Sequence, residues 1–147
     1  MVKHQVIPRS FQFEEFGNYV FVGIRRAGKS FLLYQRIQEL LHSGHTWNEM
    51  LYVNFEDERL LEMTSDDLNT ILEIGLEISG TDVKPYLFLD EIQNINGWEK
   101  FVRRMADMKY RIDITGSNSK MLSNEIASTL GGRFVILNVY PLSLIHI

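Results

Sequence analysis

The sequence of 147 residues predicts an α/β fold with a mainly parallel sheet of five strands. Short runs of β-branched and aromatic residues alternate along the chain with segments whose apolar residues recur at helical spacing. A glycine-rich turn joins the first of these strands to the first helix. The run at residues 86–89 is apolar without interruption, which is typical of a parallel strand covered on both faces. Because strands and helices alternate, we expect right-handed crossovers and helices on both sides of the sheet.

The first half of the chain supplies two of the strands and one helix. Residues 1–18 form a lead-in segment of mixed composition. The first strand is predicted at residues 19–22, and the spacing of the leucines predicts a helix over 31–41. Ser43-Gly44 ends that helix, and residues 50–55 form the second strand.

The second half supplies two helices and three strands. Ser65 is the expected N-cap of a helix that Gly80 stops, and the apolar run 86–89 is the third strand. The remaining elements are predicted as a helix over 98–108 and strands over 110–115 and 134–139. Asp113 falls in the middle of the fourth strand, where a central buried strand should be apolar, and the sequence offers no explanation for it.

The composition limits the classes of protein that fit. Hydrophobic residues make up 45% and charged residues 23%, as in globular domains rather than disordered chains. A net charge of −4 argues against a surface that coats nucleic acid, although it leaves room for local basic patches. The absence of cysteine excludes disulfides and thiolate metal sites. With no apolar run of transmembrane length and no signal-peptide core, we expect a cytoplasmic protein that does not contact the membrane.

Residues 23–30 match the phosphate-binding pattern G-x-x-x-x-G-K-[ST] at the junction of the first strand and helix. Glycines let the loop backbone turn its N–H groups toward an anion, and the start of the helix adds its positive dipole end. In this motif Lys29 reaches the β- and γ-phosphates and the Ser30 hydroxyl ligates Mg²⁺. Arg25 and Arg26 can contact phosphate or a neighbouring subunit, but a solvated loop face explains them equally well. The candidate nucleotide-binding residues here are Gly23, Arg25, Arg26, Ala27, Gly28, Lys29, Ser30 and Phe31.

Paired carboxylates, Asp90 and Glu91, follow the third strand. In phosphate-loop ATPases an aspartate at this position binds Mg²⁺ opposite the loop serine. The adjacent glutamate is placed to orient and deprotonate the attacking water. A solvated strand end is the alternative, but the phosphate loop earlier in the same chain favours the Mg²⁺ and general-base roles.

Polar residues also follow the fourth strand, in the run Thr115-Gly116-Ser117-Asn118. Ser117 and Asn118 can contact the γ-phosphate or the attacking water if this strand lies beside the first; a turn followed by a helix cap is an equal alternative. Arg133, after two glycines, is a candidate for stabilising transition-state charge, weighed against a plain surface arginine. The candidate catalytic residues are therefore Lys29, Glu91, Asn118 and Arg133.

Two further groups of residues have weaker chemical meaning. His42 and His45 are three apart, but without a second pair of ligands they do not predict a zinc site. A row of basic residues on the helix at 98–108 can contact nucleic acid, but such charges more often form the solvent-exposed face opposite a buried apolar face, here called the core stripe. The basic residues are Lys100, Arg103, Arg104 and Lys109, and the core stripe is Trp98, Phe101, Val102 and Met105.

Several segments together resemble the AAA-type ATPases of bacteria and archaea that carry an additional C-terminal domain. The resemblance runs from about Pro8 to Ser143. It rests on the phosphate loop with its arginine pair, Leu89-Asp90-Glu91-Ile92-Gln93, Gly97-Trp98-Glu99-Lys100-Phe101, Thr115-Gly116-Ser117-Asn118-Ser119, and Gly132-Arg133 through Tyr140-Pro141-Leu142-Ser143.

The resemblance implies an AAA-like P-loop NTPase fold of three layers, strand order 5-1-4-3-2, Mg-ATP binding and hydrolysis of ATP. It assigns Lys29 and Ser30 to phosphate and metal, gives Asp90 and Glu91 the Walker B role, and gives Ser117 or Asn118 the sensing of the γ-phosphate. As partner we expect either an unknown protein or a missing C-terminal domain, and we expect self-assembly of the full-length protein. A slowly hydrolysing nucleotide-dependent switch and a nucleic-acid-linked ATPase are the alternative functions.

The last residues depart from that resemblance. We expect an ATP-binding core over residues 19–141 and interpret residues 142–147 as a truncated or adapter-derived tail, because Leu142-Ser143-Leu144-Ile145-His146-Ile147 looks like a translated sequencing adapter. Codons unlike the adapter would refute this interpretation.

Overall fold

The computed structural model describes residues 18–23, 28–56, 62–79, 84–117, 130, 132 and 134–139. They form a five-stranded parallel sheet in the order β2-β3-β4-β1-β5. Read from its other edge, this is the order 5-1-4-3-2 that the family resemblance implied, so that prediction is confirmed. The strands are β1 (Tyr19–Val22), β2 (Met50–Asn54), β3 (Tyr86–Asp90), β4 (Arg111–Gly116) and β5 (Val135–Asn138).

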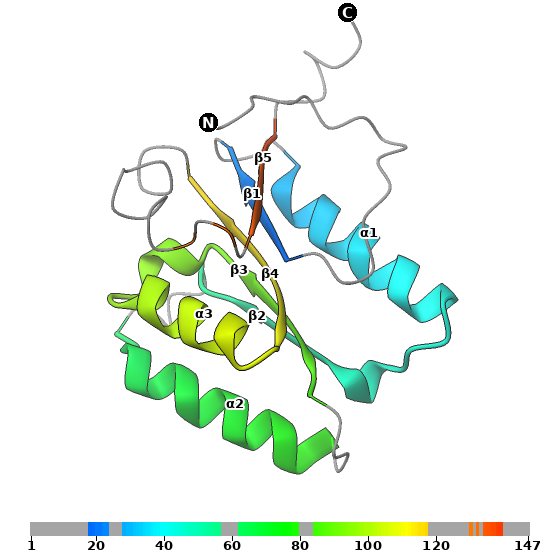
Figure 1. Cartoon of the computed structure of the whole chain (residues 1–147), viewed down its shortest axis with the longest axis horizontal. Coiled ribbons are helices and arrows are strands. Elements are labelled where there is room, and N and C mark those ends of the chain that lie inside the picture. The colour runs from blue at the N-terminus through cyan, green and yellow to red at the C-terminus, as the bar shows by residue number, and fades with distance from the viewer. Residues whose placement is uncertain are drawn as a thin grey trace, which may run out of the picture.

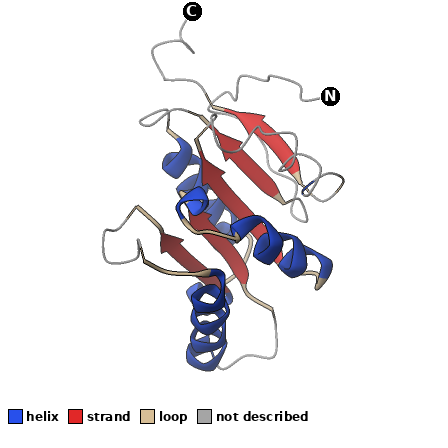
Figure 2. Ribbon diagram, turned by 90° about the vertical axis from the view of Figure 1, so that its left-hand side faces the viewer, coloured by secondary structure: helices blue, strands red, loops and turns tan. Residues whose placement is uncertain are grey.

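In the described part of the chain, the helices α1, α2 and α3 cover the sheet and give the predicted three layers (Figure 1). Helix α1 (Lys29–His42) lies on one face, while α2 (Ser65–Ser79) and α3 (Trp98–Asp107) lie on the other, as the edge-on view in Figure 2 also shows. Alternate residues of each central strand supply the two cores, because successive side chains point to opposite faces. In β3, Phe88 packs with α1 and is fully buried, whereas Leu87 packs with α2 and α3.

The structure explains Asp113, the charged residue in the middle of β4. Its carboxylate accepts a hydrogen bond from the backbone N–H of Tyr19 in β1 at 3.0 Å, and it lies 3.4 Å from Nε of Arg36 in α1. Both Asp113 and Arg36 are buried. Burial raises the pKa of Asp113 to about 7, although Arg36 and the Tyr19 N–H favour the ionised form. Asp113 therefore joins the start of β1 and the middle of α1 to the centre of the sheet.

The element boundaries differ from the predicted ones by one or two residues at several ends. Helix α1 begins at Lys29, before the predicted start at residue 31. The prediction that Ser65 caps α2 is wrong, because Ser65 is already helical and Thr64 takes the cap position. The backbone N–H of Thr64 donates to the Asp67 carboxylate at 2.8 Å, and the N–H of Asp67 donates to the Thr64 carbonyl at 3.1 Å. The Asp67 carboxylate thus satisfies the N–H of the cap residue, which is one half of a capping box.

Candidate functional site

The candidate site lies at the sheet edge where β1, β3 and β4 end. Strand β4 pairs with β1 on one side and with β3 on the other, so the predicted neighbourhood of the first and fourth strands is confirmed. The N–H of Gly23, after β1, donates to the Gly116 carbonyl at the end of β4, at 3.2 Å. Because all the strands are parallel, the two described ends of the loop (Gly23 and residues 28–30), the paired carboxylates and the end of β4 come to one edge.

Gly28 sets the entry into α1. Its φ of +93° lies in the left-handed region, and a Cβ built there would meet no atom within 4 Å. The backbone conformation, and not a shortage of space, therefore requires glycine at this position. The helix that follows directs its first N–H groups toward the site, which is the arrangement that favours an anion.

Asp90, the last residue of β3, accepts hydrogen bonds from three hydroxyls. Ser30 Oγ and Tyr52 Oη each donate to Oδ2 at 2.7 Å, and Thr115 Oγ1 donates to Oδ1 at 2.5 Å. Asp90 is only 1% exposed. Burial raises the pKa of the Tyr52 phenol, and its hydrogen bonds with Tyr34 and Asp90 raise it further, so Tyr52 stays a neutral donor.

Glu91 is held by both of its carboxylate oxygens. The Lys29 ammonium lies 2.8 Å from Oε1, and Gln93 Nε2 donates to Oε2 at 2.7 Å. Lys29 also donates to the Gly116 carbonyl at 3.2 Å and is 4% exposed, so the loop lysine is buried at the end of β4.

The backbone of Glu91 is in the left-handed region, with φ of 57°, which is unusual for a residue other than glycine. Its N–H donates to Thr115 Oγ1 at 2.8 Å, which holds this conformation. Thr115 therefore serves both carboxylate residues, as donor to the Asp90 side chain and as acceptor for the Glu91 backbone. Strain of this kind is concentrated at functional sites, where the surrounding contacts sustain it.

The oxygen atoms that meet at this edge suit a small, hard divalent cation. Ser30 and Asp90 bring a hydroxyl and a carboxylate oxygen together, and Mg²⁺ prefers oxygen ligands of these kinds. Among the described residues, no group of three or more His, Asp or Glu side chains could hold a metal ion. A cation held by Ser30 and Asp90 would therefore complete its coordination with water or with oxygens of a bound phosphate.

The structure brings four of the sequence-predicted residues together: Lys29, Ser30, Asp90 and Glu91. Phe31, the third residue of α1, is 60% exposed. Ser117 is half-buried directly after β4. Five predicted site residues lie outside the described part of the chain, namely Arg25, Arg26, Ala27, Asn118 and Arg133.

Sequence reasoning missed three contributors to the site. Tyr52 has the pattern of an ordinary β-strand residue, and nothing in the sequence shows that its hydroxyl contacts Asp90 on the neighbouring strand. Gln93 and Thr115 lie within motifs that the resemblance singled out, so a signal existed for their importance but not for their contacts. The basic residues Lys100, Arg103 and Arg104 are exposed on α3, opposite the buried apolar face of the helix.

Comparison with known proteins places the chain in a family. A model of the AAA domain matches residues 15–147. The chain belongs to the AAA domain family. This AAA domain is 43% identical over 143 residues to the protein MJ1544 of Methanocaldococcus jannaschii. It is 38% identical over 126 residues to a protein of Haemophilus influenzae, and both relatives bear the description "uncharacterized". These matches cover 96% and 84% of the chain but 31% of each relative, so the chain spans about a third of their length.

A solved structure also aligns with this AAA domain. AMPPCP-bound DnaA from Aquifex aeolicus matches with a TM-score of 0.49 and 15% identity, over 85% of this chain and 41% of that chain. Within the described ranges, none of the helices has the length and apolar character needed to cross a membrane.

Proposed function

We propose that this AAA domain binds ATP together with Mg²⁺ and that the intact protein hydrolyses ATP to ADP and phosphate. The observation that carries the proposal is the meeting of the loop residues Lys29 and Ser30 with Asp90 and Glu91 at one sheet edge. Phosphoryl transfer to water requires groups that hold the phosphates and their metal ion and a group that orients the attacking water. These requirements are matched by a buried cation, a helix start that favours anions, and two carboxylates with different surroundings. Membership of the AAA domain family supports the same reaction.

The roles of the binding residues follow from their positions. The loop N–H groups and the start of α1 bind the phosphates, and Lys29 adds a positive charge beside them. Ser30 and Asp90 hold Mg²⁺, which supplies charge neutralisation to the phosphate oxygens when it is bound. Tyr52 and Thr115 orient the Asp90 carboxylate for this task.

Glu91 is proposed as the general base for the attacking water. Its Oε1 is engaged by the ammonium of Lys29, the same cation that we assign to the phosphates. A phosphate that attracts Lys29 therefore weakens its hold on Glu91 and frees Oε1 to accept a hydrogen bond from the attacking water. Gln93 keeps the other oxygen in place, so the carboxylate stays oriented while Lys29 shifts. In this proposal, substrate binding itself prepares the base.

Further parts of the proposal rest on the resemblance and on the length of the relatives. We assign γ-phosphate sensing to Ser117 and Asn118 and charge stabilisation to Arg133. We place the ATP-binding core at residues 19–141 and propose that it works with a further domain, because the two relatives are about three times as long. Assembly into a homo-oligomer is part of the same proposal, as is a location in the cytoplasm.

The test measures ATP binding by calorimetry and ATP turnover by phosphate release, both with the full-length protein. Lys29→Ala is expected to lose most ATP binding, and Glu91→Gln is expected to bind ATP but to lose turnover by a factor of about 10²–10⁴. Glu73→Gln, at an exposed position of α2, is the matched control and should behave as the unmodified protein. Turnover that survives both Lys29→Ala and Glu91→Gln would refute the assigned roles.

The engagement of Glu91 by two neighbours favours one alternative, a switch that retains ATP and hydrolyses it slowly. Slow turnover with slow release of ATP from the full-length protein would support this alternative over rapid hydrolysis. Acceleration of turnover by DNA would instead indicate a nucleic-acid-linked ATPase.

A further inference from the structure

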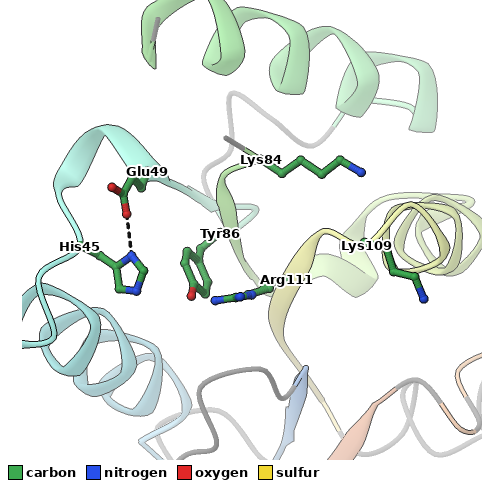
Figure 3. Close-up of a pocket in the computed structure, with 6 residues that line it drawn as sticks. All are labelled: His45, Glu49, Lys84, Tyr86, Lys109 and Arg111. Atoms are coloured by element: carbon green, nitrogen blue, oxygen red, sulfur yellow. Dashed lines mark hydrogen bonds and ion pairs between the residues drawn. The ribbon is translucent and has the colours of Figure 1, made fainter. Parts of the chain in front are cut away.

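A polar cavity lies at the opposite edge of the sheet from the proposed nucleotide site, where β3 and β4 begin (Figure 3). Its volume is about 320 Å³, and its lining residues are His45, Glu49, Lys84, Tyr86, Lys109 and Arg111. None of these residues belongs to the proposed nucleotide site. Tyr86 and Asp90 are the two ends of β3, so at about 3.3 Å per residue the two sites lie about 13 Å apart along the strand.

The cavity carries an excess of positive charge. Its three cations come from two segments: Lys84 lies before β3, and Lys109 and Arg111 lie in the connection from α3 into β4. The carboxylate in the lining, Glu49, is 2.6 Å from Nδ1 of His45. Lys84 also donates to the Met108 carbonyl, which fixes the lysine at the end of α3. Cations gathered from separate segments in one concave site attract an anion.

Tyr86 provides a second, independent indication of a ligand. Its ring lies between the edge-on ring of His45, at 5.3 Å, and the Arg111 guanidinium, 4.8 Å from the ring centre (Figure 3). The residue is 5% exposed, and its hydroxyl finds no hydrogen-bond partner among the described residues. Buried hydroxyls are normally paired, so the unpaired O–H of a residue that lines a cationic cavity is a candidate donor to an acceptor oxygen bound there.

We infer that this cavity binds a small anion that carries a phosphate group. Phosphate offers several acceptor oxygens, which suits a site with two lysines, an arginine and a phenolic O–H. The volume is at the lower end of the range for small-molecule sites, so it fits pyrophosphate or a small phosphorylated metabolite. An oligonucleotide would need a groove that follows its backbone with aromatic stacking platforms, and the compact cavity with its single tyrosine favours the small anion.

The test measures inorganic pyrophosphate binding by calorimetry in full-length protein carrying Lys29→Ala, which removes the loop cation. A parallel titration uses the unmodified protein saturated with a non-hydrolysable ATP analogue, so that the result does not depend on one variant. We expect saturable binding in both. Adding Lys109→Gln or Arg111→Gln should weaken binding by about tenfold or more, because each removes a charged donor. The matched charge control, Lys100→Gln on the exposed face of α3, should leave binding unchanged.

Tyr86→Phe separates a ligand contact from a structural role. Because the hydroxyl has no partner in the described residues, this variant should keep or raise the melting temperature while weakening pyrophosphate binding several-fold. No pyrophosphate binding in either titration, or binding unaffected by Lys109→Gln and Arg111→Gln, would overturn the inference. So would binding of a short oligonucleotide without binding of pyrophosphate. Failure of the unmodified protein to bind ATP would refute the proposed function, and the titration of the Lys29→Ala protein would still test this inference.

Discussion

Replacing Glu91 by glutamine tests the competition between Glu91 and phosphate for Lys29. The Lys29 ammonium lies 2.8 Å from Glu91 Oε1, and the two side chains are 4% and 12% exposed. Glutamine keeps the shape and an acceptor oxygen but removes the charge. A hydrogen bond to a charged group contributes about 1.5–3 kcal/mol, and one between neutral groups about 0.5–1.5 kcal/mol. The bond that phosphate must displace therefore weakens by about 1 kcal/mol.

This difference corresponds to ATP binding that is about fivefold tighter in Glu91→Gln than in the unmodified protein. Calorimetry of Mg-ATP binding to the full-length protein gives the affinity, and thermal unfolding verifies that the variant is folded. Glu73→Gln, which removes a carboxylate from the exposed surface of α2, should leave the affinity unchanged. Equal or weaker ATP binding by Glu91→Gln would refute the competition, whatever happens to turnover.

Three further predictions test other residues. Tyr52→Phe removes a hydrogen-bond donor to Asp90 and should raise several-fold the Mg²⁺ concentration needed for half-maximal ATP turnover. Tyr34→Phe, which removes the partner of Tyr52, should have a smaller effect. An unchanged Mg²⁺ requirement in Tyr52→Phe would contradict the role of Tyr52. Asp113 titrates near 7 in the fold and at 3.8 as a free side chain, so its contribution to stability is fully present below pH 4 and is lost as the pH rises through 7. Asp113→Asn should remove a slope of up to about 1.4 kcal/mol per pH unit from urea unfolding between these limits, and an equal slope in the variant would argue against the raised pKa. Phe88→Ala, at a fully buried position, should lower the free energy of unfolding by about 3–5 kcal/mol in the same assay, and a loss below 1 kcal/mol would be inconsistent with its place in the core.

The order and kind of the elements could be predicted because they depend on local patterns. Alternating strands and helices indicated the parallel sheet, and the strand order came from the family resemblance. The boundaries were less accurate because caps compete locally: Thr64 and Ser65 are both good N-cap residues, and the contact between Thr64 and Asp67 decides between them.

The contacts of the site could be predicted only where a motif implied them. The meeting of Ser30 with Asp90 follows from the two motifs, and the structure places their oxygens 2.7 Å apart. The contact of Tyr52 with Asp90 depends on the register of β2 against β3, which no local pattern determines. Asp113 seemed misplaced in its strand because its partners, Tyr19 and Arg36, are remote in the sequence. Tertiary contacts of this kind require the fold before they can be recognised.

The three hydroxyls around Asp90 have a consequence for how a cation would be received. The carboxylate of Asp90 is solvated by the hydroxyl dipoles of Ser30, Tyr52 and Thr115. None of these three side chains is charged, so the negative charge of Asp90 is not neutralised by them. The work of stripping water from this anion is thus done when the chain folds, and not when a divalent ion arrives. A divalent ion that binds Asp90 would therefore meet a carboxylate that the protein has already removed from water and held in a fixed orientation.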